Sequence, residues 1–156
     1  MQEIISELYQ KLDKAVSLCD SKCLSLSGGL DSSILAYHLK EKKPQCVTII
    51  SQDFLASDLT YCQLVAKTFG FPLEMKTITT EMILDGVENT IKVLKVFNDI
   101  EIRNNVVMYL AIKWAKDNGE KSIITGDGAD ELFAGYNFLV HKSEEELESE
   151  INRVCS

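Results

Sequence analysis

The segment Ser27–Ser33 has the composition of a phosphate-binding loop. It reads SGGLDSS, so two glycines and three serines surround a leucine and an aspartate. Glycines let the backbone approach a ligand closely, and N–H groups at the start of a following helix attract anions. An ordinary strand–turn–helix connection is the alternative. We predict that phosphate is bound by Ser27, Gly28, Gly29, Ser32 and Ser33.

Asp31 is unexpected inside such a loop, because its carboxylate repels phosphate unless a cation lies between them. Mg²⁺ accepts oxygen ligands from carboxylates and phosphates together. A second segment, Gly126–Tyr136, contains the acids Asp127, Asp130 and Glu131. We predict that Asp31 and Asp130 bind Mg²⁺ together with the phosphates. The alternative for the second segment is an acidic first turn that complements a helix dipole.

Neither segment follows the two commonest phosphate-binding patterns. The first lacks the lysine that ends a Walker A motif. The second begins like the dinucleotide fingerprint G-x-G-x-x-G, but Glu131 occupies the position of the third glycine. The two segments therefore indicate a different class of nucleotide site.

The chain around these segments alternates between helical and extended patterns. Short apolar runs predict strands at 22–26, 46–50, 72–79 and 122–125. Apolar residues at helical spacing predict helices at 4–19, 31–40, 59–69, 80–91 and 106–117, and from Ser143 onward. This alternation predicts a Rossmann-like α/β fold, a three-layer sandwich with a mainly parallel sheet. Ligands bind beyond the carboxyl ends of strands in such sheets, where both segments fall.

Charge and composition narrow the class of protein. The 156 residues carry 16 Lys and Arg against 24 Asp and Glu, a formal net charge of -8, which argues against binding to long nucleic acids. The five cysteines form no CxxC pair that would suggest a zinc site. No apolar run is long enough to span a membrane. We expect a single cytoplasmic domain over residues 1–156, with neither nucleic acid nor membrane as a partner.

The two segments together resemble the synthetase domain of the asparagine synthetase family. The resemblance rests on SGGLDSS at Ser27–Ser33 and TGDGADELFAGY at Thr125–Tyr136, and on Arg103 ahead of 108–110 (MYL). That family belongs to the N-type ATP pyrophosphatases of the PP-loop superfamily. The resemblance implies an adenine nucleotide alpha hydrolase-like fold, with ATP and Mg²⁺ as cofactors.

The resemblance also implies a reaction. A small carboxylate attacks the α-phosphate of ATP to give an acyl-AMP and pyrophosphate, and ammonia or an amine then displaces AMP to form an amide. In that scheme the serine-rich loop holds the pyrophosphate. Backbone groups near Leu26, Ile50 and Gly126 hold the adenosine. Asp127 supports catalysis, and Arg103 contacts the substrate or the phosphates.

The chain departs from the family pattern in several places. It has no cysteine at position 2, so we expect no glutaminase activity of its own. Ile100 and Glu101 stand where the family tends to have threonines. The family's segment beyond the acidic loop is missing. We therefore expect a second copy of the chain or a separate glutaminase subunit as a partner. The alternative function is a nucleotide-binding module that keeps the ATP pocket but lacks complete synthetase chemistry.

Overall fold

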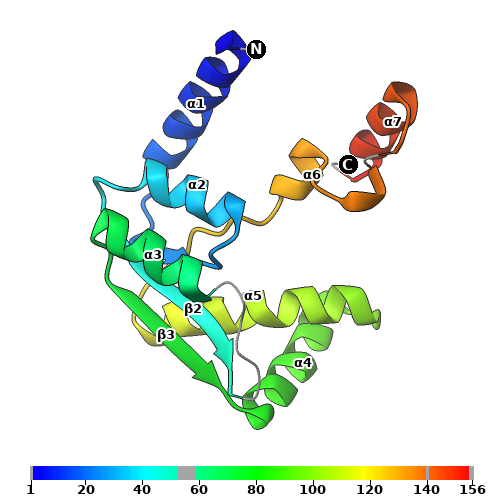
Figure 1. Ribbon diagram of the computed structural model, residues 1–156. Coiled ribbons are helices and arrows are strands. Elements are labelled where there is room, and N and C mark those ends of the chain that lie inside the picture. The colour runs from blue at the N-terminus through cyan, green and yellow to red at the C-terminus, as the bar shows by residue number, and fades with distance from the viewer. Residues whose placement is uncertain (1, 53–58, 140, 155–156) are drawn as a thin grey trace. The chain divides into compact units, whose positions relative to one another are not determined.

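The computed structural model describes residues 2–52, 59–139 and 141–154 (Figure 1). It divides the chain into two compact units, Met1–Thr125 and Gly126–Ser156. The first unit holds a parallel sheet and its covering helices, and the second holds short helices. The single domain expected from the sequence stays a prediction.

Three parallel strands form the sheet of the first unit. They are β1 (Cys23–Ser25), β2 (Gln45–Ser51) and β3 (Leu73–Ile78), in the order β1-β2-β3. Leu24 of β1 pairs with Cys46 of β2, and the other edge of β2 pairs with β3, also in parallel. Each pair of neighbouring strands is joined through a helix, which is the connection that parallel strands require.

The predicted fourth strand at 122–125 is wrong in extent, because only one parallel bridge forms there, between Ile124 and Leu24. The Ile124 N–H donates to the Cys23 carbonyl and the Ile124 carbonyl accepts from the Ser25 N–H, each at 2.9 Å. The other edge of β1 is already paired with β2. Since β1 is three residues long, it offers few positions for a longer ladder.

This bridge gives the sheet its topological switch point. The strands advance from β1 through β2 to β3 in one direction, and the chain then returns to the opposite side of β1 at Ile124. Open parallel α/β sheets bind ligands in the crevice at such a reversal, beyond the carboxyl ends of the strands. The segment that follows β1 begins at Leu26 and leads into the serine-rich loop.

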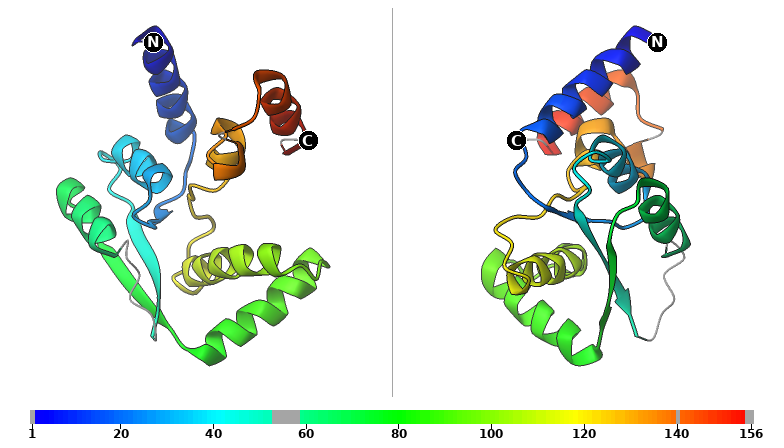
Figure 2. Two further views of the ribbon diagram at one scale, coloured as in Figure 1. Left: turned by 45° about the vertical axis from the view of Figure 1, so that its right-hand side comes forward. Right: turned by 90° about the vertical axis from the view of Figure 1, so that its left-hand side faces the viewer.

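Helices cover both faces of the sheet (Figures 1 and 2). On one face Leu24 and Cys46 belong to a core that includes residues of α2 (Leu30–His38) and α3 (Leu59–Phe69). On the other face Cys23 and Val47 pack against α5 (Asp99–Asp117). Neighbouring residues of β1 and β2 face opposite sides of the sheet, as a pleated strand requires. Since helices pack on both sides, the predicted three-layer α/β fold is confirmed.

Helix α5 is longer than its apolar spacing predicts. It begins at Asp99, where Val106 was expected, because the Asn98 side chain caps it. The Asn98 Oδ1 accepts hydrogen bonds from the N–H groups of Ile100 (3.0 Å) and Glu101 (3.2 Å). Helix α4 (Thr80–Leu94) packs along α5.

Helix α1 (Gln2–Ser17) opens the chain and is tied to α2 and the loop that follows it. The Lys42 Nζ donates to the Val16 and Cys19 carbonyls, each at 2.9 Å, so it satisfies acceptors at the end of α1. His38 Nδ1 lies 3.3 Å from Asp13 Oδ1. In the part of the chain that the structure describes, no helix combines the length and apolarity needed to cross a bilayer.

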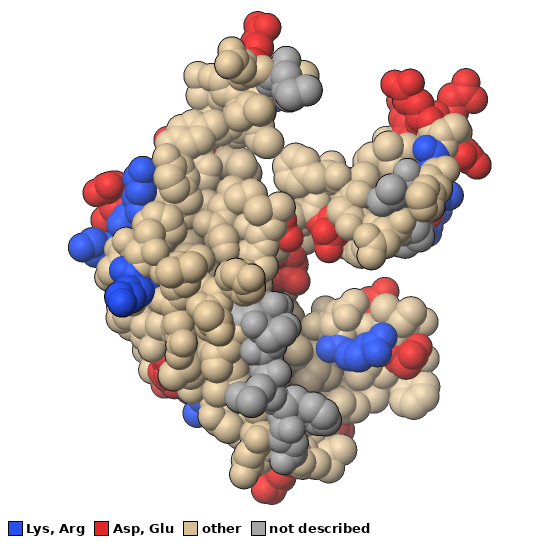
Figure 3. Space-filling model, viewed as in Figure 1, with Lys and Arg blue, Asp and Glu red and all other residues tan. Residues whose placement is uncertain are grey.

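The second unit contains α6 (Ala129–Phe133), a 3₁₀ turn η1 (Asn137–Leu139) and α7 (Glu144–Val154). The helix predicted from Ser143 onward is confirmed, and a capping box begins it: the Ser143 N–H donates to Glu146 Oε2 at 2.9 Å and the Glu146 N–H donates to Ser143 Oγ at 3.4 Å. Acidic side chains gather on α7 (Figure 3).

Candidate nucleotide-binding site

The serine-rich loop lies between β1 and α2. The Leu26 N–H still donates to the Val47 carbonyl at 2.9 Å, so the chain leaves the sheet only after Leu26. Gly28 then adopts a φ of +82°. Residues with a side chain rarely adopt this left-handed conformation, so the turn itself requires glycine here.

The serines fix the shape of this loop. Ser27 Oγ lies 3.0 Å from Ser32 Oγ and accepts from the Gly29 N–H at 3.3 Å. The Ser33 hydroxyl donates to the Gly29 carbonyl at 2.7 Å. Ser32 is buried, whereas Ser27 is exposed. Ser27 is therefore an exposed residue on a loop that internal hydrogen bonds hold in shape.

The amino end of α2 suits an anion. The helix begins at Leu30 with Gly29 as its N-cap, and no side chain among the described residues caps it. A helix leaves its first backbone N–H groups without partners inside the helix, and these groups carry a partial positive charge. The glycine turn, the exposed residue Ser27 and the uncapped helix therefore fit a phosphate group.

Two of the predicted adenosine contacts lie in the first unit, Leu26 directly after β1 and Ile50 in the neighbouring strand β2. Leu26 is fully buried, and its carbonyl accepts from the Cys62 thiol at 3.3 Å. A carbonyl has two lone pairs, so this oxygen can still accept a second hydrogen bond. Ile50 lies near the carboxyl end of β2, paired with Thr77 of β3. Cys62 lies within the predicted helix 59–69, and nothing in its local sequence marks it as a partner of Leu26.

The buried cysteines are core thiols. Cys46 and Cys62 are buried in the same cluster, and Cys23 lies in the core on the opposite face of the sheet. Burial, with smaller contributions from Cys23 and Cys62, raises the pKa of Cys46 to about 12. Half-buried Cys19 and the three buried cysteines are all free thiols.

Arg103 lies on the first half of α5, beside an apolar groove between α4 and α5. The groove has a volume of about 540 Å³, and Asp99 and Arg103 are its charged lining residues. Its apolar lining includes Ile83, Val87 and Val106. Arg103 is exposed and forms no ion pair with the described residues. Its guanidinium is therefore available to an anionic group.

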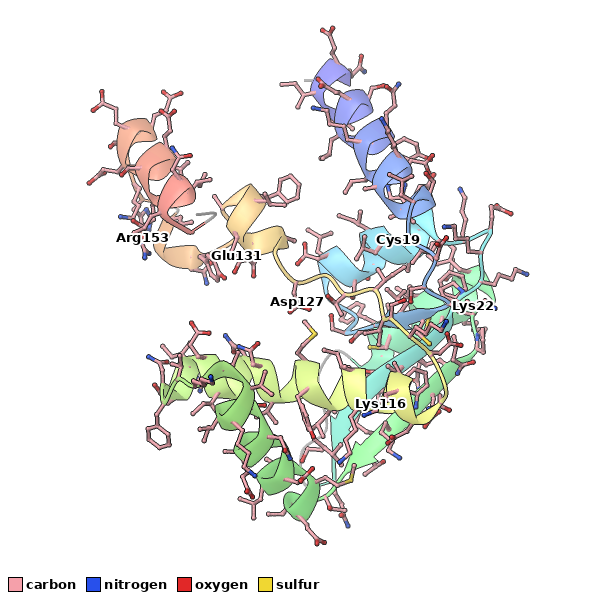
Figure 4. All side chains as sticks on the ribbon, turned by 180° about the vertical axis from the view of Figure 1, so that it is seen from behind. Cys19, Lys22, Lys116, Asp127, Glu131 and Arg153 are labelled. Carbon is pink, nitrogen blue, oxygen red and sulfur yellow. The ribbon has the colours of Figure 1, made fainter. Side chains whose placement is uncertain are left out.

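The acidic segment lies in the second unit. Asp127 is exposed in the turn before α6, and Glu131 lies on α6 (Figure 4). Gly128 is the N-cap of α6 with a φ of +90°, which favours glycine. Asp130 lies in the first turn of α6 and is exposed, and Gly126 is half-buried. The predicted catalytic carboxylate, Asp127, and the predicted metal ligand, Asp130, are thus both accessible to solvent.

The structure describes the two predicted metal ligands, Asp31 and Asp130, in separate units, so their joint site stays a prediction. Within the described residues, no group of three His, Cys, Asp or Glu side chains could hold a metal ion. Mg²⁺ does not need such a cage, because it is commonly bound by one or two carboxylates together with substrate phosphates and water. Asp130 is exposed and Asp31 is half-buried, and each carboxylate fits Mg²⁺ that arrives with a nucleotide.

Comparison with known proteins identifies relatives of the whole chain. The family model described as Asparagine synthase matches residues 7–153. A putative glutamine-hydrolyzing asparagine synthetase of Methanocaldococcus jannaschii is 31% identical over 149 residues, which cover 90% of this chain and 25% of that protein. The glutamine-hydrolyzing asparagine synthetase of Rattus norvegicus is 33% identical over 85% of this chain and 25% of its own length. The chain thus spans about a quarter of the length of these curated relatives.

Solved structures support the fold. An NMN synthetase from Francisella tularensis matches with a TM-score of 0.53 and 20% identity, over 84% of this chain and 58% of that one. An NH3-dependent NAD synthetase from Campylobacter jejuni matches with a TM-score of 0.52 and 19% identity, over 98% of this chain and 72% of that one. At this identity the likeness concerns the fold, which is the predicted PP-loop, adenine nucleotide alpha hydrolase-like fold.

Proposed function

Because the chain belongs to the asparagine synthase family, we propose that it binds ATP and activates a small carboxylate as an acyl-AMP for amide formation. Members of this family are ATP-dependent synthetases that form amides. The adenylate step is what we propose for this chain. The observation that carries it is the loop Ser27–Ser33 at the switch point of a parallel sheet.

The loop is proposed to hold the β- and γ-phosphates that leave as pyrophosphate. The turn at Gly28 leads into the uncapped start of α2, whose first backbone N–H groups carry a partial positive charge. Ser27 is an exposed residue of the same loop, and Ser32 and Ser33 hold the loop in shape through Gly29. Such a preformed set of donors stabilises departing charge without reorganisation during the reaction.

The carboxylates are proposed to serve the cation and the reacting centre. Asp31 and Asp130 would hold Mg²⁺, which lowers the charge on the departing pyrophosphate when it is bound. Asp127 is proposed to support catalysis from its exposed turn ahead of α6. Arg103, free of ion pairs with described residues, would bind the substrate carboxylate or a phosphate. Backbone near Leu26, Ile50 and Gly126 would hold the adenosine.

The second candidate function is a nucleotide-binding module that keeps the ATP pocket but lacks complete synthetase chemistry. The glycine turn and the uncapped start of α2 fit phosphate binding with or without that chemistry. The relatives are named as glutamine-hydrolyzing. For this chain we propose ammonia or an amine as nitrogen donor, supplied free or by a separate glutaminase subunit, with a second copy of the chain as another possible partner.

Exchange of labelled pyrophosphate into ATP tests the proposal directly. The purified chain is incubated with ATP, Mg²⁺ and each member of a panel of small carboxylates that includes aspartate. Exchange that depends on one acid supports adenylation. Calorimetry with ATP and GTP then measures nucleotide binding. A chain that binds ATP more tightly than GTP but shows no exchange has the second function. A chain that binds neither nucleotide contradicts both.

A further inference from the structure

Gly135 lies against the side chain of Asp130, just beyond the end of α6. Ala134 ends the helix with a φ of +56°, and the Gly135 N–H then donates to the Asp130 carbonyl at 3.0 Å. A Cβ built on Gly135 would lie 2.9 Å from Asp130 Cγ and closer still to Oδ1. The carboxylate of Asp130 therefore occupies the place that any side chain at position 135 would take.

The backbone conformation does not explain why position 135 is a glycine. Its φ lies outside the left-handed region, unlike that of Gly128 at the other end of the same helix. An alanine would thus keep the backbone of residue 135 without dihedral strain. What the alanine could not keep is the present rotamer of Asp130, because real Cβ atoms do not approach other heavy atoms so closely.

The end of α6 is held on both sides of this contact. The Tyr136 hydroxyl donates to the Glu131 carboxylate, and the Leu132 N–H donates to the Gly128 carbonyl at 3.1 Å. The Asp130 Cα, part of the backbone, lies 3.2 Å from the same Cβ position. Since residue 136 is tied to α6, a substituted residue 135 cannot simply swing away. The flexible Asp130 carboxylate is the part that moves.

We infer that Gly135 is a positioning residue that fixes the direction of the Asp130 carboxylate for Mg²⁺. This inference rests on the proposed function, in which Asp130 is a metal ligand. Mg²⁺ demands near-ideal octahedral geometry, so a ligand turned to another rotamer binds it poorly. Groups that orient a metal ligand typically change metal affinity by about 10–100-fold when they are mutated. A Cβ at position 135 should weaken the metal within that range while leaving ATP affinity in the absence of metal unchanged.

A double-mutant cycle tests the inference with Gly135→Ala, Asp130→Ala and the double variant. The probe is Mn²⁺ with ATP, followed by electron paramagnetic resonance, and unfolding in urea is measured on all four proteins. We expect Gly135→Ala to weaken Mn²⁺ binding about 10–100-fold. In the Asp130→Ala background, which lacks the carboxylate, the same substitution should not weaken Mn²⁺ binding further. It should also lower the urea midpoint less than it does in the unmodified chain, because only the 3.2 Å approach to the Cα of residue 130 remains.

The outcomes separate this inference from the proposed function. Near-native Mn²⁺ binding by Gly135→Ala overturns the positioning role. An equal loss of stability from Gly135→Ala with and without the Asp130 carboxylate also overturns it, because the effect would then be general. If the unmodified chain binds no Mn²⁺ with ATP, the proposed function fails, and the urea midpoints of the cycle alone decide whether residue 135 and the Asp130 carboxylate are coupled.

Discussion

Replacing Gly28 with alanine should remove most ATP binding at a small cost in stability. Gly28 has a φ of +82° in the loop that follows β1. An L-residue in the left-handed region costs roughly 1–2 kcal/mol. A relaxed turn would also misdirect backbone N–H groups, and losing one hydrogen bond to a charged group costs about 1.5–3 kcal/mol. Since about 1.4 kcal/mol corresponds to a tenfold change, ATP affinity should fall by about 10- to 100-fold.

Gly119 supplies the matched control. It has a φ of +78° in the turn after α5, and a Cβ there would meet no atom within 4 Å. Gly119→Ala therefore carries the same dihedral cost of roughly 1–2 kcal/mol without touching the loop. Both variants should show similarly lowered thermal midpoints. Calorimetry with ATP and Mg²⁺ should find weakened binding for Gly28→Ala alone. Equal ATP affinity of the two variants would refute the assignment of the loop.

Three further predictions follow from single residues. Asp31→Asn and Asp130→Asn should each lower pyrophosphate exchange on the order of 100-fold with unchanged far-ultraviolet circular dichroism, because a lost carboxylate weakens Mg²⁺; near-native exchange in either variant counts against its metal role. Cys46, whose pKa is raised to about 12 by burial, should resist iodoacetamide at pH 8 in the folded protein and react once unfolded, as peptide mass spectrometry can show. The hydrogen bond from Lys113 lowers the pKa of Asp85 in the folded protein. The ionised Asp85 carboxylate therefore stabilises the fold at neutral pH, and this stabilisation is lost as the pH falls through the folded pKa. The urea midpoint of Asp85→Asn should accordingly change less with acid than that of the unmodified chain.

The sequence by itself determined most of the local structure of the first unit. Alternating apolar runs and helical spacing predicted the strands and helices around the sheet, because each period buries one face of its element. Gly28 was predictable as a turn residue, since glycine adopts positive φ at low cost. The family could be identified from two motifs and their order, and the match over residues 7–153 confirms it.

Local signals failed where a distant partner or a cap decided the outcome. Residues 122–125 have the composition of a strand but form one bridge, because three-residue β1 is their partner. Helix α5 begins at Asp99 because the Asn98 side chain caps a polar stretch that apolar spacing does not mark. Both differences depend on contacts outside the segment that was being interpreted.

The tertiary structure alone decided the strand order and the surroundings of the acids. The switch point exists because Ile124 pairs with Leu24 across about a hundred residues of chain, and no local pattern encodes that pairing. The contact of Gly135 with Asp130 likewise depends on the left-handed turn at Ala134, which folds the chain back onto α6. Sequence periodicity reports which face of an element is buried, whereas pairing and close approach depend on where the other elements lie.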